Sequence, residues 1–129
     1  MSRDNVELME DLLTAGQNGD MERLEELTHE DCVVDEPESL PYGGEYTGET
    51  AFPDIFADIA GTWDAFDFEG PDIWDAGEKV FVLWQVEAEA SGGVVEQPLM
   101  EVYEIEDEQI IRADIFYKDT AAILEAVEA

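Results

Sequence analysis

Few side chains in this 129-residue sequence could bind a transition metal or act as a strong nucleophile. The only histidine, His29, has no second histidine or cysteine pair to complete a metal site, and it follows a predicted helix whose C-terminus favours a positive charge. The only cysteine, Cys32, begins a Val-Val segment that is typical of a buried strand. The glycines form neither a GxGxxG nor a P-loop pattern, so no cofactor is expected. We interpret His29 and Cys32 as structural residues and expect no metal.

Two tyrosines stand out because of the segment that carries them. Tyr42 and Tyr46 lie within residues 36–48, a stretch rich in proline and glycine that predicts a loop. Loops commonly present binding residues, so the two hydroxyl groups could border a ligand pocket, and they could equally bond to backbone groups. Most of the other aromatic residues are more typical of a core than of a ligand platform.

Charge is the unusual property of this sequence. It contains 35 acidic and 5 basic residues, which gives a formal net charge of -30. The acidic residues are spread over every segment, whereas a tail that binds a basic partner would concentrate them. We interpret the composition as that of a protein from a halophilic archaeon that accumulates salt, and an acidic partner-binding protein is the alternative. Five basic residues make no phosphate-binding surface, so nucleic-acid binding is not expected.

The remaining composition indicates a soluble, cytoplasmic protein. No apolar segment approaches the length that spans a membrane, and no positively charged apolar leader is recognisable. A single cysteine permits no intrachain disulfide, which is consistent with a reducing compartment.

Helices are expected in the first half of the chain and at its end. Apolar residues recur at helical spacing over residues 5–18 and 21–27. Thr50 can cap a third helix, and Asp119 or Thr120 can cap a last one.

Strands are expected between and after these helices. A short strand at 32–35 precedes the loop, and residues 63–74 predict a bulged strand because Gly-Pro interrupts their aromatic pattern. Segments 79–91, 94–106 and 109–118 predict an antiparallel meander with polar turns between them. In the last of these strands, alternation predicts an apolar face that consists of Ile111, Ala113, Ile115 and Tyr117. Such a sheet needs the helices to cover one side.

Several short motifs carry a resemblance to a known family. They are Gly19-Asp20, Asp31 and Pro37 around the first strand, LPYGGEYTG at 40–48, and residues 110–121. With the order of elements, they resemble the cone-shaped α+β fold of the nuclear transport factor 2-like superfamily, in the branch of SnoaL-like polyketide cyclases and ketosteroid isomerases. The resemblance implies a single domain over residues 1–129. It also implies a curved antiparallel sheet, three covering N-terminal helices, and an internal apolar pocket that opens near residues 37–48.

The resemblance also suggests where a catalytic base would lie. Ketosteroid isomerases use a carboxylate base, with a tyrosine and a protonated aspartic acid as oxyanion donors. An alignment without gaps places the base at Glu36, with Asp35 beside it, and places the donors at Leu12 and Met100. Leu12 and Met100 cannot donate a hydrogen bond to an oxyanion, so steroid-type isomerisation is not expected.

The SnoaL-like cyclases instead place an aspartate on the last strand, which corresponds to Asp114. Alternation puts Asp114 on the polar face beside Arg112, where an ion pair is favoured over catalysis unless a bulge inverts the register. By the same argument Glu101 faces away from the pocket if Met100 faces into it.

The resemblance therefore predicts a SnoaL-like protein that binds a small hydrophobic molecule, cyclic or carbonyl-bearing, and that could perform cofactor-independent isomerase, cyclase or hydrolase chemistry. A non-catalytic ligand-binding or dimerisation module is the alternative. The candidate catalytic residues are Glu36, Asp35 and Asp114. The candidate ligand-binding residues are Leu12, Tyr42, Trp63, Met100 and Tyr117. A homodimer is expected through the outer sheet face, with apolar contacts from Phe81, Leu83 and Phe116.

The charge predicts a dependence on salt. In dilute buffer the net charge of -30 repels itself, whereas 1 M salt reduces the Debye length to about 3 Å. We expect the protein to unfold on dialysis from molar KCl into dilute buffer, followed by circular dichroism. A stable, folded monomer in dilute buffer would contradict the halophilic interpretation.

Overall fold

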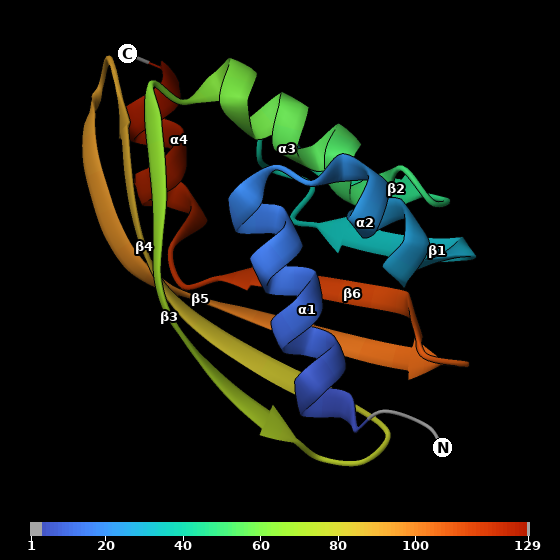
Figure 1. The fold of residues 1–129 in the computed structure, drawn as a ribbon. Coiled ribbons are helices and arrows are strands. Elements are labelled where there is room, and N and C mark those ends of the chain that lie inside the picture. The colour runs from blue at the N-terminus through green and yellow to red at the C-terminus, as the bar shows by residue number, and fades with distance from the viewer. Residues whose placement is uncertain (1–3, 129) are drawn as a thin grey trace.

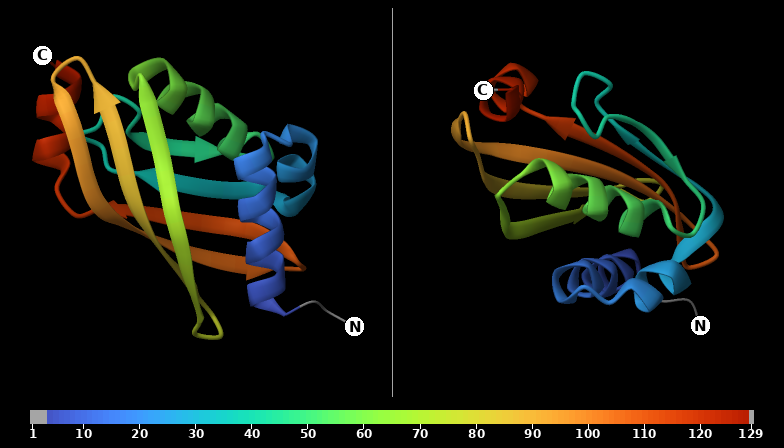
Figure 2. Two further views of the ribbon diagram at one scale, coloured as in Figure 1. Left: turned by 60° about the vertical axis from the view of Figure 1, so that its left-hand side comes forward. Right: turned by 90° about the horizontal axis from the view of Figure 1, so that it is seen from above.

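The computed structural model describes residues 4–128 as a curved six-stranded sheet with helices packed against its inner face (Figure 1). The elements in chain order are α1 (Asn5–Asn18), α2 (Met21–Leu27), β1 (Thr28–Glu36), β2 (Gly44–Thr47), α3 (Ala51–Thr62), β3 (Ala65–Asp75), β4 (Val80–Ala90), β5 (Gly93–Glu106), β6 (Gln109–Tyr117) and α4 (Thr120–Glu128). Seen from above, α1, α2 and α3 lie on one side of the sheet (Figure 2). The expected α+β cone with three covering helices is confirmed.

The sheet is curved as expected and antiparallel between all neighbouring strands but one pair, which makes it mixed. The strand order is β2-β1-β6-β5-β4-β3, and β1 pairs with β6 in parallel while the other neighbours are antiparallel. The first strand is also longer than 32–35, and the expected loop contains the short edge strand β2. Proline and glycine concealed β2, because they mark a turn without excluding a four-residue strand beside it.

Caps explain where the first two helices begin. The Asp4 carboxylate accepts a hydrogen bond from the Glu7 backbone N–H, and the Asp20 carboxylate accepts one from Arg23 N–H. Gly19 ends α1 with φ 67°, a left-handed conformation that glycine adopts without strain. No helix within residues 4–128 has the length and apolar character needed to cross a membrane.

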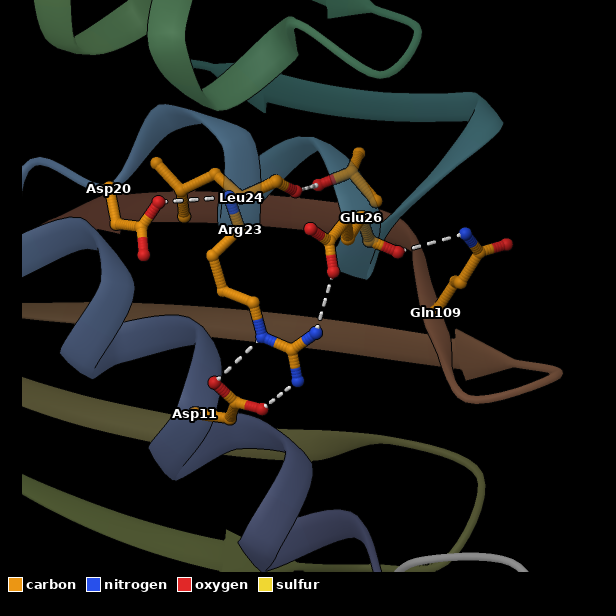
Figure 3. A network of polar contacts seen from close by, with 7 residues as sticks. Asp11, Asp20, Arg23, Leu24, Glu26 and Gln109 are labelled. Atoms are coloured by element: carbon orange, nitrogen blue, oxygen red, sulfur yellow. Dashed lines mark hydrogen bonds and ion pairs between the residues drawn. The ribbon is translucent and has the colours of Figure 1, made fainter.

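Arg23 connects α1 to α2 (Figure 3). Its Nε donates to Asp11 Oδ1 at 3.2 Å and its Nη1 donates to Glu26 Oε2 at 2.9 Å, while Nη2 also pairs with Asp11. The Gln109 amide donates to the Glu26 carbonyl at 3.1 Å, which ties α2 to the start of β6. In a chain with so few basic residues, this one guanidinium holds two carboxylates at the junction of the first helices.

The core lies between the helices and the concave face of the sheet. Alternate residues of β4 are buried on this face, namely Val80, Val82, Trp84, Val86 and Ala88. Opposite them, α1 and α3 bury apolar residues at helical spacing. The apolar face of the strand, which has a period of two residues, therefore packs against the apolar faces of the helices. Helix α4 packs Ile123 and Ala126 into this core beside the β4–β5 hairpin (Figure 1).

A bulge changes the expected inner face of β6. Ile110 is fully buried whereas Ile111 is half-buried, because the register with β5 shifts between Glu104 and Ile105. Beyond this bulge the alternation predicted from the sequence holds, with Ala113 and Ile115 buried. A bulge inserts one extra residue into a strand, so the side chains on one side of the bulge point to the opposite face from the one that simple alternation predicts.

The outer face of the sheet carries exposed apolar side chains. Trp74 is 51% exposed and Phe116 is 54% exposed, and Phe81, Leu83 and Met100 are half-buried around them. Contact between two copies across this face stays a prediction, which light scattering in solution would test.

Candidate functional site

A cavity of about 380 Å³ lies between α1, α3 and the concave face of the sheet. Its lining is mostly apolar and includes the aromatic side chains of Phe52, Phe56, Phe66, Phe68, Trp84 and Tyr103, with Leu12, Leu13 and Leu24 from the helices. The exposed lining residues Gln17 and Asp67 mark its opening, between the end of α1 and β3. This volume and lining suit a small hydrophobic ligand.

Glu101 is a carboxyl group of this cavity. It stands on β5 opposite Val82 and Ile115, both buried, so its side chain points to the concave face. Its Oε1 accepts hydrogen bonds from Trp84 Nε1 at 2.6 Å and from the Tyr103 hydroxyl at 3.0 Å. Burial raises the pKa of Glu101 to about 7, although these two donors oppose the rise because they stabilise the carboxylate.

Glu36 is the second inward carboxyl group and ends β1. It is only 4% exposed, and its Oε2 has no hydrogen-bond partner in the described part of the chain. Burial raises the pKa of Glu36 to about 8, and the negative charges of Glu101 and Asp35 add to the rise. At neutral pH the Glu36 side chain is therefore mainly the uncharged acid.

A small inner chamber of about 20 Å³ joins the two acids. Glu36, Glu101 and Tyr117 all line it, and Phe52, Phe56 and Phe68 lie between it and the larger cavity. Glu36 and Glu101 reach it from β1 and β5, on either side of Ile115 of β6. The curved sheet therefore brings together two carboxyl groups that are far apart in the sequence.

A chain of hydrogen bonds supports the tyrosine in this chamber. The Tyr117 and Tyr42 hydroxyl groups are 3.0 Å apart, and Trp63 Nε1 donates to Tyr42 at 3.2 Å. Tyr42 is 1% exposed, so it stands behind Tyr117 rather than at a pocket mouth. Burial and the nearby charge of Glu36 raise the pKa of Tyr117, so its hydroxyl stays protonated and can donate. The other candidate tyrosine, Tyr46, lies on β2, and its hydroxyl is 2.7 Å from an Asp58 carboxylate oxygen and 3.0 Å from the Tyr42 carbonyl oxygen, which share its one hydrogen.

Asp35 and Asp114 lie outside this site. They are paired across β1 and β6 on the outer face, where Arg112 donates to both oxygens of Asp114 at 3.1 and 2.9 Å and lies 3.9 Å from Asp35. Strand alternation explains the separation, because Asp35 points out whenever its neighbour Glu36 points in. A shallower pocket of about 320 Å³ near Pro37 borders Asp35, Asp114 and Glu36.

The expected ligand-binding residues are divided among different places. Leu12 lines the aromatic cavity and Tyr117 lines the inner chamber, while Trp63 borders a separate pocket of about 320 Å³ near Ile59. Met100 lies on the outer face opposite Phe116 and Leu83, so the expectation that it faces the pocket was wrong. The expected opening near residues 37–48 matches only the shallower pocket, because no residue of that segment lines the aromatic cavity.

The sequence analysis did not identify Glu101 as a site residue. It assigned the inward face of this strand from the position of Met100 alone. Placing Met100 inward forced Glu101 outward, whereas the apolar residues Val95, Leu99 and Tyr103 share a face with Glu101. Their spacing is a signal that the sequence contained. Within residues 4–128 no group of three acidic, histidine or cysteine side chains is arranged to hold a metal ion.

Comparisons with known proteins agree with this architecture. A family model described as a SnoaL-like domain matches residues 9–113. No curated protein matches significantly. Among solved structures, TerC co-crystallised with polyporic acid is 19% identical, with a TM-score of 0.83 over 97% of this chain and 98% of TerC. An NTF2-like protein of unknown function from Burkholderia pseudomallei K96243 is 18% identical, with a TM-score of 0.85 over 99% and 100% of the two chains.

A further structural relative is a proposed SnoaL-like polyketide cyclase from Jannaschia sp. CCS1. It is 16% identical, with a TM-score of 0.79 over 100% of this chain and 98% of that protein. At such identities the likeness concerns the fold, and chemistry has to be argued from the residues described above.

The buried acid Glu36 predicts a specific pH dependence of stability. Because folding raises its pKa from 4.5 to about 8, the folded protein binds this proton more tightly than the unfolded chain, and stability falls as pH rises between these values. Glu36→Gln lacks this ionisation. As pH rises, its free energy of unfolding should therefore increase relative to that of wild type by up to about 1.4 kcal/mol per pH unit. Urea unfolding at pH 5 to 8 in constant molar KCl measures the difference. The control Glu30→Gln, at an exposed position of the same strand, should run parallel to wild type, and a parallel Glu36→Gln curve would contradict the prediction.

Proposed function

The chain belongs to the SnoaL-like domain family, and on that basis we propose that it binds a small hydrophobic molecule, cyclic or carbonyl-bearing, in the aromatic cavity under α1 and α3. We further propose that Glu36 and Glu101 perform cofactor-independent proton transfer on this molecule. The proposal rests chiefly on one observation, namely that two inward carboxyl groups with raised pKa values share an inner chamber at the end of an apolar cavity.

The two acids differ in the groups around them, and this difference assigns their roles. Glu101 accepts two hydrogen bonds that favour its charged form, whereas Glu36 has none for Oε2. Near neutral pH the first proton is therefore lost from Glu101, and its charge helps to keep the proton on Glu36. Glu101 is the general base and Glu36 is the general acid, which reverses the base assignment suggested by the family resemblance.

A carbonyl-bearing substrate would use both groups in one step. The Glu101 carboxylate removes a proton from the carbon next to the carbonyl, the electron pair forms a carbon–carbon double bond, and the carbonyl oxygen takes the proton of Glu36. If the substrate has a carbon–carbon double bond one position further away, the product is a neutral dienol. Glu101 then returns its proton to the far carbon of the diene and the enol hydroxyl returns its proton to Glu36, which completes an isomerisation and restores both acids. The acid pair carries one negative charge before and after the step, so no additional charge is buried.

Tyr117 is the third group that can contact the reacting oxygen. It lines the same chamber as Glu36, and its position is fixed through Tyr42 and Trp63. A hydroxyl held by neighbours can donate to a developing negative charge without reorganisation.

Ligand binding and proton exchange can be measured on the same variants. We expect at least one compound in a panel of small cyclic ketones, phenols and terpenoid epoxides to raise the melting temperature in molar KCl. With a ketone that binds, wild type should incorporate solvent deuterium next to the carbonyl, followed by NMR. Glu101→Gln should slow this exchange about a hundredfold or more because it removes the base.

The matched control is Glu106→Gln, which makes the same change at an exposed position of the same strand. It should exchange deuterium at the wild-type rate. If ligands bind but Glu101→Gln exchanges as fast as wild type, the acid–base proposal fails and a non-catalytic binding module remains. If no compound of the panel shifts the melting temperature, the cavity is better understood as part of a structural or dimerisation module.

A further inference from the structure

The charges around the aromatic cavity all have one sign. Glu101 lines the interior and Glu36 lies in the inner chamber behind it, whereas the Asp67 side chain at the rim is directed to the outer face opposite Glu87. No lysine, arginine or histidine lines either space among the described residues. A ligand anion would therefore find no opposite charge to offset the loss of its hydration.

The basic side chains of residues 4–128 are used elsewhere. Arg23 joins α1 to α2, Arg112 pairs with aspartates on the outer face, and Lys79 lies 3.4 Å from Glu104. Lys118 borders the groove beside α4. Among the described residues, no cation therefore lies in the cavity to balance its negative field.

Several aromatic rings lie close together in the cavity wall. The centroids of Phe66 and Phe68 are 5.0 Å apart, those of Phe68 and Trp84 are also 5.0 Å apart, and Phe52 stacks on Tyr103 at 6.4 Å. The face of each ring carries partial negative charge, so a cation that lies against several such rings is attracted to all of them. A pocket for a neutral hydrophobic ligand could be lined equally well by aliphatic side chains.

A second, independent feature points to a ligand in this space. The Oε2 atom of Glu36 is buried without a hydrogen-bond partner, and Glu36 lines the chamber that adjoins the aromatic cavity. A buried polar atom without a partner is costly unless a bound molecule supplies one. The N–H of a protonated amine can donate a hydrogen bond to this oxygen.

We propose that the cavity selects a hydrophobic ligand with a positively charged nitrogen, a protonated or quaternary amine, placed between the aromatic rings and the Glu101 carboxylate. The C-terminal turn of α1 supports this choice, because Gly16 and Gln17 border the cavity where the negative end of the helix dipole lies. This inference rests on the proposed function, since it names the ligand class of the same cavity. It adds that the ligand carries an ammonium group in addition to the group on which the acids act, so that the cavity binds it more tightly than an uncharged molecule of equal size.

Three probes of similar size and different charge test the proposal on the wild-type protein. Phenyltrimethylammonium is the cation, tert-butylbenzene has the same shape without charge, and benzoate is the anion. Binding is measured by NMR titration in molar KCl at pH 8, because this salt concentration screens unspecific attraction of the cation to the acidic surface. We expect the cation to bind at least about tenfold more tightly than tert-butylbenzene, and benzoate not to bind, because both the aromatic rings and Glu101 favour positive charge.

Variants locate the binding site. Glu101→Gln should weaken phenyltrimethylammonium about tenfold and leave tert-butylbenzene unchanged, whereas Glu106→Gln should change neither. Equal affinities of wild type for the cation and its neutral counterpart would overturn the inference while leaving the proposed hydrophobic site intact. A loss of cation binding that is the same in Glu106→Gln as in Glu101→Gln would also overturn it, because the binding would then reside on the surface. If none of the probes binds, the amine inference fails, and it fails together with the proposed function if the ketone panel also gives no shift.

Discussion

The placement of two carboxyl groups inside one apolar cavity is the constraint on which the site depends. Each acid resists ionisation there because it is buried, and the charge of Glu101 makes ionisation of Glu36 harder still. The pair therefore retains about one proton near neutral pH and carries one negative charge. Trp84 and Tyr103 decide where that charge lies, because both donate to Glu101. This asymmetry allows two chemically identical side chains to act as a base and an acid.

The fold creates the pair through the topology of the sheet. The parallel contact between β1 and β6 brings Glu36 next to Ile115, and the antiparallel contact with β5 brings Glu101 to its other side. The same alternation that turns Glu36 inward turns Asp35 outward, where Arg112 joins it to Asp114. Acidic residues are abundant in this chain, so orientation on the strands, rather than residue type, distinguishes the site from the surface.

Much of the fold was predictable from local patterns, whereas the site was not. Apolar spacing and caps located the helices, and turn signals located the meander, because these features depend on neighbouring residues. Which side chains of a strand point inward depends on the assignment of a single starting residue. One bulge or one wrong assignment therefore reverses the prediction for the residues that follow. Met100 and Ile111 show this, since each was assigned to the inner face and neither is buried there. The parallel β1–β6 contact joins distant segments and has no local signal at all.

The most direct test of this account is a measurement of the two ionisations themselves. The carboxyl carbons of protein labelled with ¹³C-glutamate can be followed by NMR from pH 4 to 10 in molar KCl, with signals assigned through Glu36→Gln and Glu101→Gln. We expect two late, coupled titrations with apparent pKa values of about 7 and about 8, and we expect Glu101→Gln to lower the pKa of Glu36 because it removes a neighbouring charge. Titration of both residues with the exposed glutamates, near about 4.3, would contradict the central claim.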